Sequence, residues 1–166
     1  MSNILDQLVF IGSSFTHFLF SLPFSILGLT KYNENDIIAD WQPPGYVFAI
    51  VWPILYLLFG IINLKVEFSS KHSINFKNKV IGESIIESLL QALWLLVTAK
   101  IYESRTDIQY QLGFFVMLGL LFYAFKVRSD TLSIDKTLTL LYLPYKLWIS
   151  FATILSFQQL TKLYKI

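Results

Sequence analysis

The sequence contains no cysteine among its 166 residues, which excludes disulfides, thiolate metal sites, iron–sulfur clusters and a cysteine nucleophile. Charge is also scarce: Asp, Glu, Lys and Arg make up 14% of the chain, where a soluble domain carries about 25%. Hydrophobic residues make up 55%, and the mean hydropathy is +0.57. A net charge of only +2 gives no indication of nucleic-acid binding. This composition indicates an integral membrane protein.

The motifs of common enzyme classes are missing as well. There is no phosphate-binding glycine loop, no HExxH zinc motif and no serine nucleophile elbow. Glu83 and Glu87 are spaced like a paired-carboxylate site, but no histidine accompanies them at metal-ligand spacing. The sequence therefore predicts neither catalytic nor metal-binding residues, and it favours a binding protein over an enzyme.

Apolar stretches account for most of the chain, and a membrane span needs roughly 20 apolar residues. We expect an all-α integral membrane protein, a five-transmembrane-helix bundle built as one domain over residues 1–166. The polar segments 67–79 and 126–136 and a short turn at 103–107 are expected to be loops. Basic residues are shared almost evenly between the two sides, so the orientation stays open. The expected spans are about 4–29, 46–66, 80–99, 108–125 and 137–157.

Polar side chains interrupt the third expected span. Glu83, Glu87 and Gln91 are spaced i, i+4, i+8, and Trp94 follows three residues later, so all lie along one face of a helix. A carboxylate facing lipid costs at least about 2–3 kcal/mol, so this face is expected to point into the bundle. One interpretation is a polar patch for a ligand or for protons, favoured for Glu87 and Gln91. The other places Glu83 near the interface and uses Glu87 only to tie helices together.

Aromatic residues surround the start of the second span, in the segment WQPPGYVFAIVWPILY over residues 41–56. Proline suits the first helical turn, where no amide donor is needed, so the helix is expected to open just after the double proline. Trp41 and Tyr46 are explained by the aromatic belt of the membrane interface. Trp52 and Tyr56 lie about two and three turns into the helix, too deep for that belt. Aromatic walls at that depth suit a flat apolar ligand.

Two further candidates come from the fifth and the first span. Trp148 and Ala152 lie on one stripe, where a small residue beside a large one leaves room for a ligand or equally allows close helix packing. His17 is a candidate axial ligand for haem iron, although a lone histidine within a span is more often hydrogen-bonded to a neighbouring helix. The sequence alone leaves both pairs of alternatives open.

These segments, in this order, resemble the TspO/MBR family, which contains the tryptophan-rich sensory proteins of bacteria and the mitochondrial translocator protein (peripheral benzodiazepine receptor). The second-span pattern W-x-P-P-x-W-x-F-x-x-x-W-x-x-L-Y is present as Trp41, Pro43, Pro44, Tyr46 in place of tryptophan, Phe48, Trp52, Leu55 and Tyr56. The fifth-span pattern P-Y-x-x-W-x-x-x-A-x-x-L-N is present as Pro144, Tyr145, Trp148, Ala152, Leu155 and, in place of asparagine, Ser156. The third-span pattern Q-L-x-x-N-x-x-W has become Glu87, Ser88, Gln91 and Trp94.

The resemblance implies a five-helix bundle, often a dimer. Its pocket near the first loop would bind porphyrins, haem, benzodiazepine-site drugs and, in animal members, cholesterol. By motif position, Trp52 and Trp148 are expected on opposite walls of this pocket, with Gln91 between them and Ala49 in the wall. The complete set of candidate ligand-binding residues is Ala49, Trp52, Tyr56, Glu87, Gln91, Trp148 and Ala152.

The sequence leaves three functions open. The leading one is a membrane protein that binds, transports or senses tetrapyrroles (porphyrin or haem) or similar flat apolar ligands such as sterols and benzodiazepine-site drugs. The second is an enzyme that degrades porphyrin under light, with Trp52 and Trp148 as redox-active residues, and the third is a membrane scaffold with a vestigial pocket. No cofactor is required beyond the ligand. The expected partners are that ligand, the lipid bilayer and a second copy, and the expected location is a bacterial envelope membrane or a mitochondrial or other internal membrane of a eukaryote.

Overall fold

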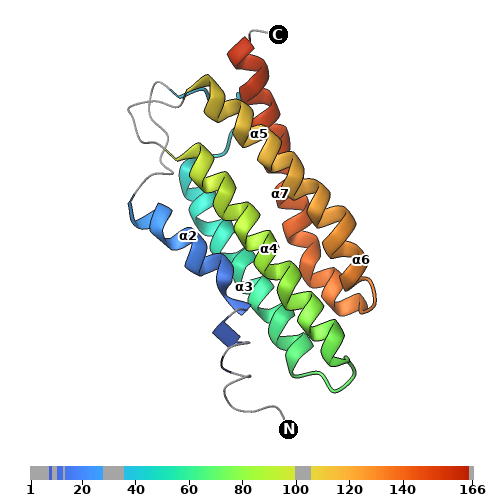
Figure 1. The fold of residues 1–166 in the computed structure, drawn as a ribbon. Helices are drawn as coiled ribbons and strands as arrows, with labels where there is room; N and C mark the ends of the chain where they lie inside the picture. Colours follow the sequence, from blue (N-terminus) through green and yellow to red (C-terminus); the bar gives the residue numbers. More distant parts are fainter. Residues whose placement is uncertain (1–7, 9–10, 13, 28–35, 100–105, 165–166) are drawn as a thin grey trace.

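The computed structural model describes residues 8, 11–12, 14–27, 36–99 and 106–164. Because α5, η1 and α6 follow one another without a break, the described residues form five helical rods (Figure 1). The all-α five-helix bundle predicted from the sequence is confirmed. The helices are α2 (Thr16–Ile26), α3 (Gly45–Glu67), α4 (Ile74–Thr98), α5 (Asp107–Phe122), the π-helix η1 (Tyr123–Arg128), α6 (Ser129–Leu132) and α7 (Lys136–Tyr164).

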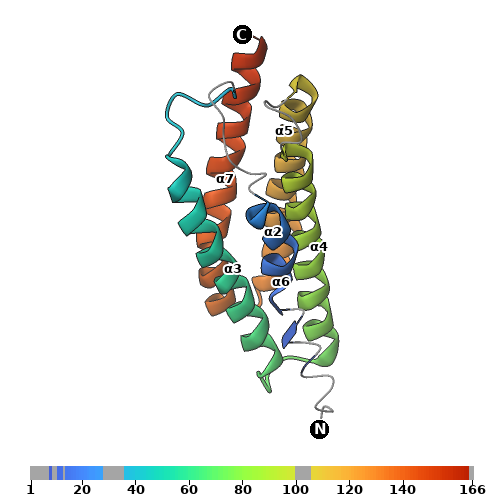
Figure 2. The same ribbon diagram turned by 90° about the vertical axis from the view of Figure 1, so that its left-hand side faces the viewer.

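The four long rods form a closed ring in which each packs against two neighbours. α3 contacts α4 and α7, and α5 also contacts α4 and α7, while the short α2 packs against α4 and α3. Figure 2 shows the bundle from the side of α2, which lies in front of the seam between α3 and α4. Side chains from all five rods therefore reach one common interior.

The outer faces of the bundle are apolar. Large side chains such as Leu57, Ile86 and Phe115 are exposed on them, which suits contact with lipid tails and would be an association surface in water. The helix α2 has 11 residues, and most of the remaining first span expected over 4–29 lies outside the described residues. Four described rods are long and apolar enough to cross a membrane: Gly45–Glu67, Ile74–Thr98, Asp107–Leu132 and Lys136–Tyr164.

Local capping signals fix where two of the spans begin. The Oγ of Ser73 accepts a hydrogen bond from the backbone N–H of Phe76 at 3.3 Å, so α4 starts at Ile74. Thr106 and Gln109 form a capping box at the start of α5. The expected loop over 67–79 is therefore wrong in its second half, because the serine cap lets the polar residues that follow form the first turns of a helix.

The expected loop over 126–136 is also wrong in its first half. The fourth rod continues through η1 and α6 to Leu132, and the backbone N–H of Ser129 bonds to the carbonyl of Ala124, five residues back, as in a π-helix. The sequence argument assigned Lys126 and Arg128 to a loop because charges are rare within spans. Lys126 is indeed exposed, but Arg128 is 0% exposed, and partners inside the bundle satisfy its charge.

The apolar core fills the end of the bundle where α3 ends and α7 begins. Close packing here extends to the residue just before α2, because a Cβ placed on Gly60 of α3 would lie 2.5 Å from the Phe15 ring. The opposite end, where α3 begins and α7 ends, is where the interior space remains. The most deeply buried apolar residues of the core include Phe59, Ile62, Val66, Met117, Leu120, Leu132, Leu138 and Ile149.

Candidate functional site

A cavity of about 1080 Å³ lies at the end of the bundle where α3 begins and α7 ends. It is bounded by α2, α3, α4 and α7 and by the segment 36–44. Sites for small molecules and cofactors occupy roughly 300–1,000 Å³, so this cavity suits a large ligand. Its lining is mostly aromatic and apolar, with a few amides and hydroxyls. The lining residues are Phe18, Ser21, Leu22, Ile38, Gln42, Pro43, Pro44, Gly45, Tyr46, Phe48, Ala49, Trp52, Pro53, Tyr56, Trp94, Leu95, Thr98, Ala152, Leu155, Ser156 and Gln159.

Four of the predicted ligand-binding residues line this cavity. Ala49, Trp52 and Tyr56 come from one face of α3, and Ala152 comes from α7. The rings of Trp52 and Tyr56 contact each other, with centroids 5.7 Å apart, so the wall formed by α3 is a continuous aromatic surface. Trp94 of α4 adds a further indole to the lining.

Trp148 takes a different place from the one expected. Its ring contacts Trp52 edge-to-face at 6.2 Å between centroids and Phe48 at 5.5 Å, so the two tryptophans do not face each other across the cavity. Trp148 is not among the lining residues. The reason is the close seam between α3 and α7, where aromatic rings from both helices fill the space that a ligand was expected to occupy.

Gln91 and Glu87 lie deeper in the bundle, beneath the cavity. Both are buried, as their shared helical face predicted. Gln91 lies one turn of α4 below the lining residues Trp94 and Leu95, and none of the described residues hydrogen-bonds its carboxamide. Neither residue lines the cavity, so contact with a ligand stays a prediction for both.

His17 is bonded to a neighbouring helix, which is the second of the two alternatives for this residue. Its Nδ1 lies 2.7 Å from Oγ of Ser88, and its ring stacks on Phe59 with centroids 4.0 Å apart. It does not line the cavity. Among the described residues, no group of three or more His, Asp or Glu side chains is placed to hold a metal ion.

The segment 36–44 forms the rim of the cavity and is bonded to the end of α7. Gln159 Nε2 donates to Gln42 Oε1 at 2.9 Å, and Lys162 Nζ donates to the carbonyl of Ile38 at 3.0 Å and pairs with Asp40. These bonds explain why α7 extends to Tyr164, beyond the end expected near residue 157, since its polar last turns have partners in the rim.

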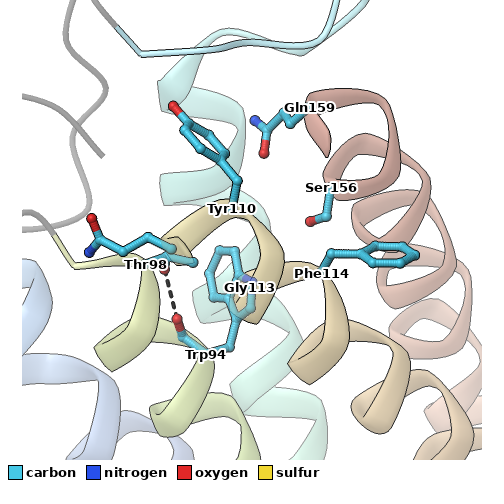
Figure 3. Close-up of a pocket in the computed structure, with 8 residues that line it drawn as sticks. Trp94, Thr98, Tyr110, Gly113, Phe114, Ser156 and Gln159 are labelled. Atoms are coloured by element: carbon cyan, nitrogen blue, oxygen red, sulfur yellow. Dashed lines mark hydrogen bonds between the residues drawn. The ribbon is translucent and has the colours of Figure 1, made fainter. Parts of the chain in front are cut away.

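A second, much smaller cavity of about 10 Å³ lies between α4, α5 and α7 (Figure 3). It is large enough for about one water molecule. It shares Trp94, Thr98, Ser156 and Gln159 with the main cavity, so those side chains form the wall between the two. The helices α4 and α5 approach closely here, because a Cβ on Gly113 would lie 2.9 Å from Cγ2 of Thr98.

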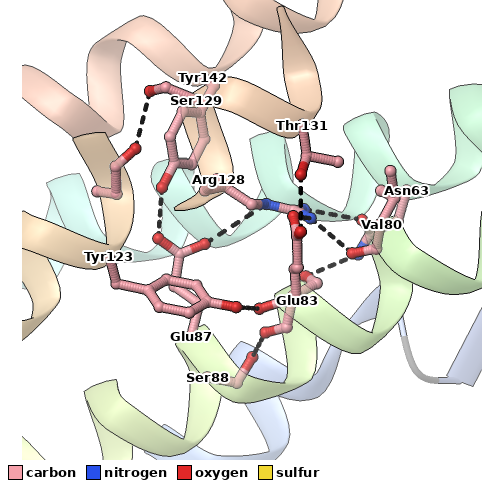
Figure 4. A network of polar contacts seen from close by, with 12 residues as sticks. Asn63, Val80, Glu83, Glu87, Ser88, Tyr123, Arg128, Ser129, Thr131 and Tyr142 are labelled. Carbon is pink, nitrogen blue, oxygen red and sulfur yellow. Dashed lines mark hydrogen bonds and ion pairs between the residues drawn. The ribbon is translucent and has the colours of Figure 1, made fainter. Parts of the chain in front are cut away.

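Glu83, Glu87 and Arg128 form an ion cluster in the interior (Figure 4). Along α4, the two glutamates lie on the far side of Gln91 from the cavity-lining Trp94. Arg128 NH2 donates to Asn63 Oδ1 at 3.2 Å, and NH1 donates to the carbonyl of Val80. NH1 also lies 3.7 Å from Glu83 Oε2, and Nε lies 3.7 Å from Glu87 Oε2. One guanidinium from η1 thus joins α3 and α4.

Hydroxyl groups complete the surroundings of the two carboxylates. Thr131 Oγ1 donates to Glu83 Oε1 at 2.7 Å, and the hydroxyl of Tyr142 on α7 donates to Glu87 Oε1. The hydroxyl of Tyr123 donates to the backbone carbonyl of Glu83 at 3.1 Å. The cluster and its hydrogen-bond partners therefore link α3, α4, η1, α6 and α7 at one level of the bundle.

Sequence reasoning identified the two glutamates of this cluster and missed its cation. A signal was available: two carboxylates within a span need a cationic partner, and intramembrane charges pair with one another. Arg128 follows the buried Ala124 by four residues, the spacing of one helical face. Extending the fourth helix past Phe125 would have brought Arg128 to the interior and given Glu83 and Glu87 their partner.

Comparison with known proteins agrees with this architecture. The profile of the TspO/MBR family matches residues 19–161 of the chain. A relative, the "Tryptophan-rich protein TspO" of Chlorobaculum tepidum, is 26% identical over 131 residues, covering 76% of this chain and 75% of its own. Four described helices are long and apolar enough to span a membrane, and the family match agrees with this. The protein is therefore an integral multi-pass membrane protein. The chain belongs to the TspO/MBR family.

Proposed function

We propose that the cavity binds a tetrapyrrole, such as porphyrin or haem, or a similar flat apolar molecule such as a sterol or a benzodiazepine-site drug. The observation that carries the proposal is the cavity itself, about 1080 Å³ lined by the rings of Trp52, Tyr56 and Trp94. A flat macrocycle stacked on these rings gains roughly 0.5–1.5 kcal/mol per aromatic contact beyond the burial of area. Binding of this kind serves transport or sensing in a membrane and needs no resident cofactor.

The polar groups of the cavity suit the edges of such a molecule. Gln42, Gln159 and Ser156 lie among otherwise apolar lining residues, near the rim formed by 36–44. A few placed polar groups in an apolar site fix the orientation of a ligand. The propionates of a porphyrin directed to this rim would meet amide and hydroxyl donors, while the ring system would remain among the aromatic residues.

Titration with protoporphyrin tests the proposal. In detergent-solubilised protein, protoporphyrin is expected to quench tryptophan fluorescence saturably, and Trp94, which lines the cavity, reports binding in every variant used. The Trp52→Phe, Trp148→Phe double variant should bind at least about tenfold more weakly, since ~1.4 kcal/mol is one decade. Trp41→Phe is the matched control, because Trp41 contacts Phe151 and does not line the cavity.

Two outcomes would contradict the proposal. Equal affinity of the parent and the double variant would show that the indoles of Trp52 and Trp148 do not contribute to ligand binding. Absence of saturable quenching in the parent would favour the third function, a membrane scaffold with a vestigial pocket.

A second candidate function, light-dependent porphyrin breakdown, is favoured by one observation. The indoles of Trp52 and Trp148 are in contact, at 6.2 Å between centroids, and only Trp52 borders the cavity. A pair of this kind can share an unpaired electron formed beside a bound, excited pigment. Illumination of the porphyrin complex, followed by analysis of pigment products in the parent and in Trp148→Phe, separates this function from binding alone.

We further propose that the chain is a single membrane domain and that it pairs with a second copy, as the family resemblance implies. The mass of the protein in detergent, corrected for bound detergent, decides between monomer and dimer. A monomeric mass at all protein concentrations would show that the protein does not pair with a second copy.

A further inference from the structure

The ion cluster contains more negative than positive charge when both of its glutamates are ionised. Arg128 and Glu87 are 0% exposed, and Glu83 is 7% exposed. Lys79 is near, with its Nζ 3.8 Å from Glu83 Oε1, but its side chain is 61% exposed and its charge is screened by solvent. An uncompensated charge inside a membrane protein is strongly disfavoured, and neutralisation by a proton is the usual remedy. One carboxyl of the cluster is therefore expected to carry a proton.

The contacts identify which carboxyl this is. Glu83 lies 3.7 Å from Arg128 and accepts a hydrogen bond from the hydroxyl of Thr131. It also lies 3.8 Å from Lys79, a cation that solvent screens but with which Glu87 forms no ion pair among the described residues. Glu87 has one cation among the described residues, Arg128, and it is 0% exposed where Glu83 is 7% exposed. The hydrogen bonds do not separate the two carboxyls, because Tyr142 donates to Glu87 as Thr131 does to Glu83, and none of the described residues donates to Oε2 of either. Since the anion of Glu87 is both more deeply buried and less well compensated, Glu87 is the residue that keeps the proton.

Other titratable groups lie around Glu87 on α2, α3, α4, η1 and α7. Most of them are tyrosines or permanently charged groups that keep their state near neutral pH. A histidine in water changes its protonation state near neutral pH. The ring of His17, however, is buried against Phe59 and bonded to Ser88. The groups are His17 on α2, Tyr56 on α3, Lys79 and Glu83 on α4, Tyr123 and Arg128 on η1, and Tyr142 and Tyr145 on α7.

Glu87 lies close enough to the cavity for its charge to act on a ligand. It is two turns of α4 from Trp94, about 10 Å along the helix axis. Its donor Tyr142 packs against Phe59 at 5.7 Å, and His17 connects Phe59 to the lining residue Tyr56 at 4.0 and 5.5 Å between centroids. The carboxylates of a porphyrin directed to the rim would lie farther away, near Thr98, which is about 16 Å from Glu87 along the helix axis. At that separation, one charge alters the affinity for a charged ligand about fivefold.

We propose that Glu87 is a proton-binding site within the membrane, and that loss of its proton lowers the affinity of the cavity for ligands that carry carboxylates. With the proton in place, Arg128 and Glu83 form a neutral pair beneath the cavity. Without it, a negative charge repels a carboxylate ligand, and by linkage such a ligand favours proton uptake. The second half of this proposal rests on the proposed function.

Infrared spectroscopy tests the proton site without any ligand. The detergent-solubilised parent should show, at neutral pH, the carbonyl stretch of a protonated carboxylic acid, and the band should disappear at high pH. Glu87→Gln should abolish it, whereas Asp130→Asn, which alters an exposed carboxyl on α6, should leave it unchanged. Should Glu87→Gln fail to fold, Tyr142→Phe removes the donor to Glu87 and should shift the band to higher frequency. A parent without this band, or a band that persists in Glu87→Gln or is unmoved in Tyr142→Phe, overturns the proton site.

Binding of two porphyrins then tests the coupling. Over the pH range in which the acid band disappears, the affinity of the parent for protoporphyrin should fall about fivefold. Protoporphyrin dimethyl ester, which has no carboxylates, should show no such fall. The pH dependence should vanish in Glu87→Gln and persist in His17→Asn. An equal fall for the ester, or one that survives Glu87→Gln, overturns the coupling. Absence of saturable binding by either porphyrin contradicts the proposed function, and the infrared result then decides the proton site by itself.

Discussion

The interiors of the two ends of the bundle differ, because one contains a cavity and the other contains buried ionic side chains. At one end, aromatic side chains line a cavity of about 1080 Å³. At the other, Glu83, Glu87 and Arg128 are buried among apolar residues and hydroxyl groups. The helix α4 contributes to both, with Trp94 at the cavity and the two glutamates at the cluster. We infer that substitutions at the cavity end change ligand binding more than stability, and that those at the cluster end do the reverse.

The largest effect is expected from Arg128→Met. Removing the guanidinium leaves Glu83 and Glu87 buried without their cation, and breaking a buried pair in this way costs about 3–5 kcal/mol. Thermal unfolding in detergent measures the loss, and failure to accumulate folded protein is its extreme form. Lys126→Met is the control, because Lys126 is exposed on the same π-helix and should change little. Equal stability of the two variants would show that the cluster does not hold this end together.

The same alanine-to-leucine change at the two ends gives the sharpest comparison. Ala124 is 0% exposed in the packed end, so Ala124→Leu should destabilise the protein by about 1–3 kcal/mol through overpacking. Ala152 borders the cavity, so Ala152→Leu has room, and it should lower protoporphyrin affinity with a stability change below about 0.5 kcal/mol. Unfolding curves and protoporphyrin titrations are needed for both variants. Similar profiles for the two would remove the distinction between the ends.

A smaller effect is expected from Glu87→Gln. The amide oxygen still accepts the hydrogen bond from Tyr142, and the amide is uncharged like the protonated acid that it replaces. The free energy of unfolding should stay the same or rise, by at most about 1 kcal/mol, since the amide cannot lose a proton and leave an uncompensated buried charge. Thermal unfolding at neutral pH checks this. A marked loss of folded protein would mean that Arg128 depends on the charge of Glu87.

The smallest effect concerns Asp135, in the turn before α7. The backbone N–H of Thr137 donates to Asp135 Oδ1 at 2.7 Å and lowers the pKa of this carboxyl, with a minor contribution from His72. A folded-state pKa below the unfolded one contributes stability that is present above the unfolded value and lost as the pH falls through the folded one. Asp135→Asn should therefore reduce stability at neutral pH by at most about 0.5 kcal/mol, the scale of an exposed ion pair. The difference should vanish in acid, and a difference that grew in acid would contradict this assignment.

Much of the fold follows from local signals that a single sequence contains. The double proline and the apolar run after it predict the start of α3, and the face shared by Glu87 and Gln91 predicts their burial. Arg128 was not predictable by the same means, because its burial depends on partners from two other helices. Tertiary contacts decide such a position, and hydropathy alone assigns it to a loop.

The candidate site was predictable to a similar extent. Aromatic residues too deep for the interfacial belt pointed to Trp52 and Tyr56, and both border the cavity. The contact between Trp52 and Trp148 was not predictable, because the distance between α3 and α7 depends on how all the rings in that seam pack together. The sequence motif predicts which residue types line the site, whereas the distance between α3 and α7 depends on the packing of the whole bundle.

The π-helix η1 has a consequence for how this chain compares with its relatives along the sequence. A π-turn takes up about one residue more than an α-turn, so the stretch between Leu120 and Leu132 holds an extra residue without displacing the helix on either side. Insertions in membrane proteins are usually accommodated in loops, yet here one fits inside a span. Relatives whose fourth span is a regular α-helix should therefore align with this chain through a one-residue gap at 123–128. An alignment that forbids gaps within spans would put Arg128 opposite the wrong residue.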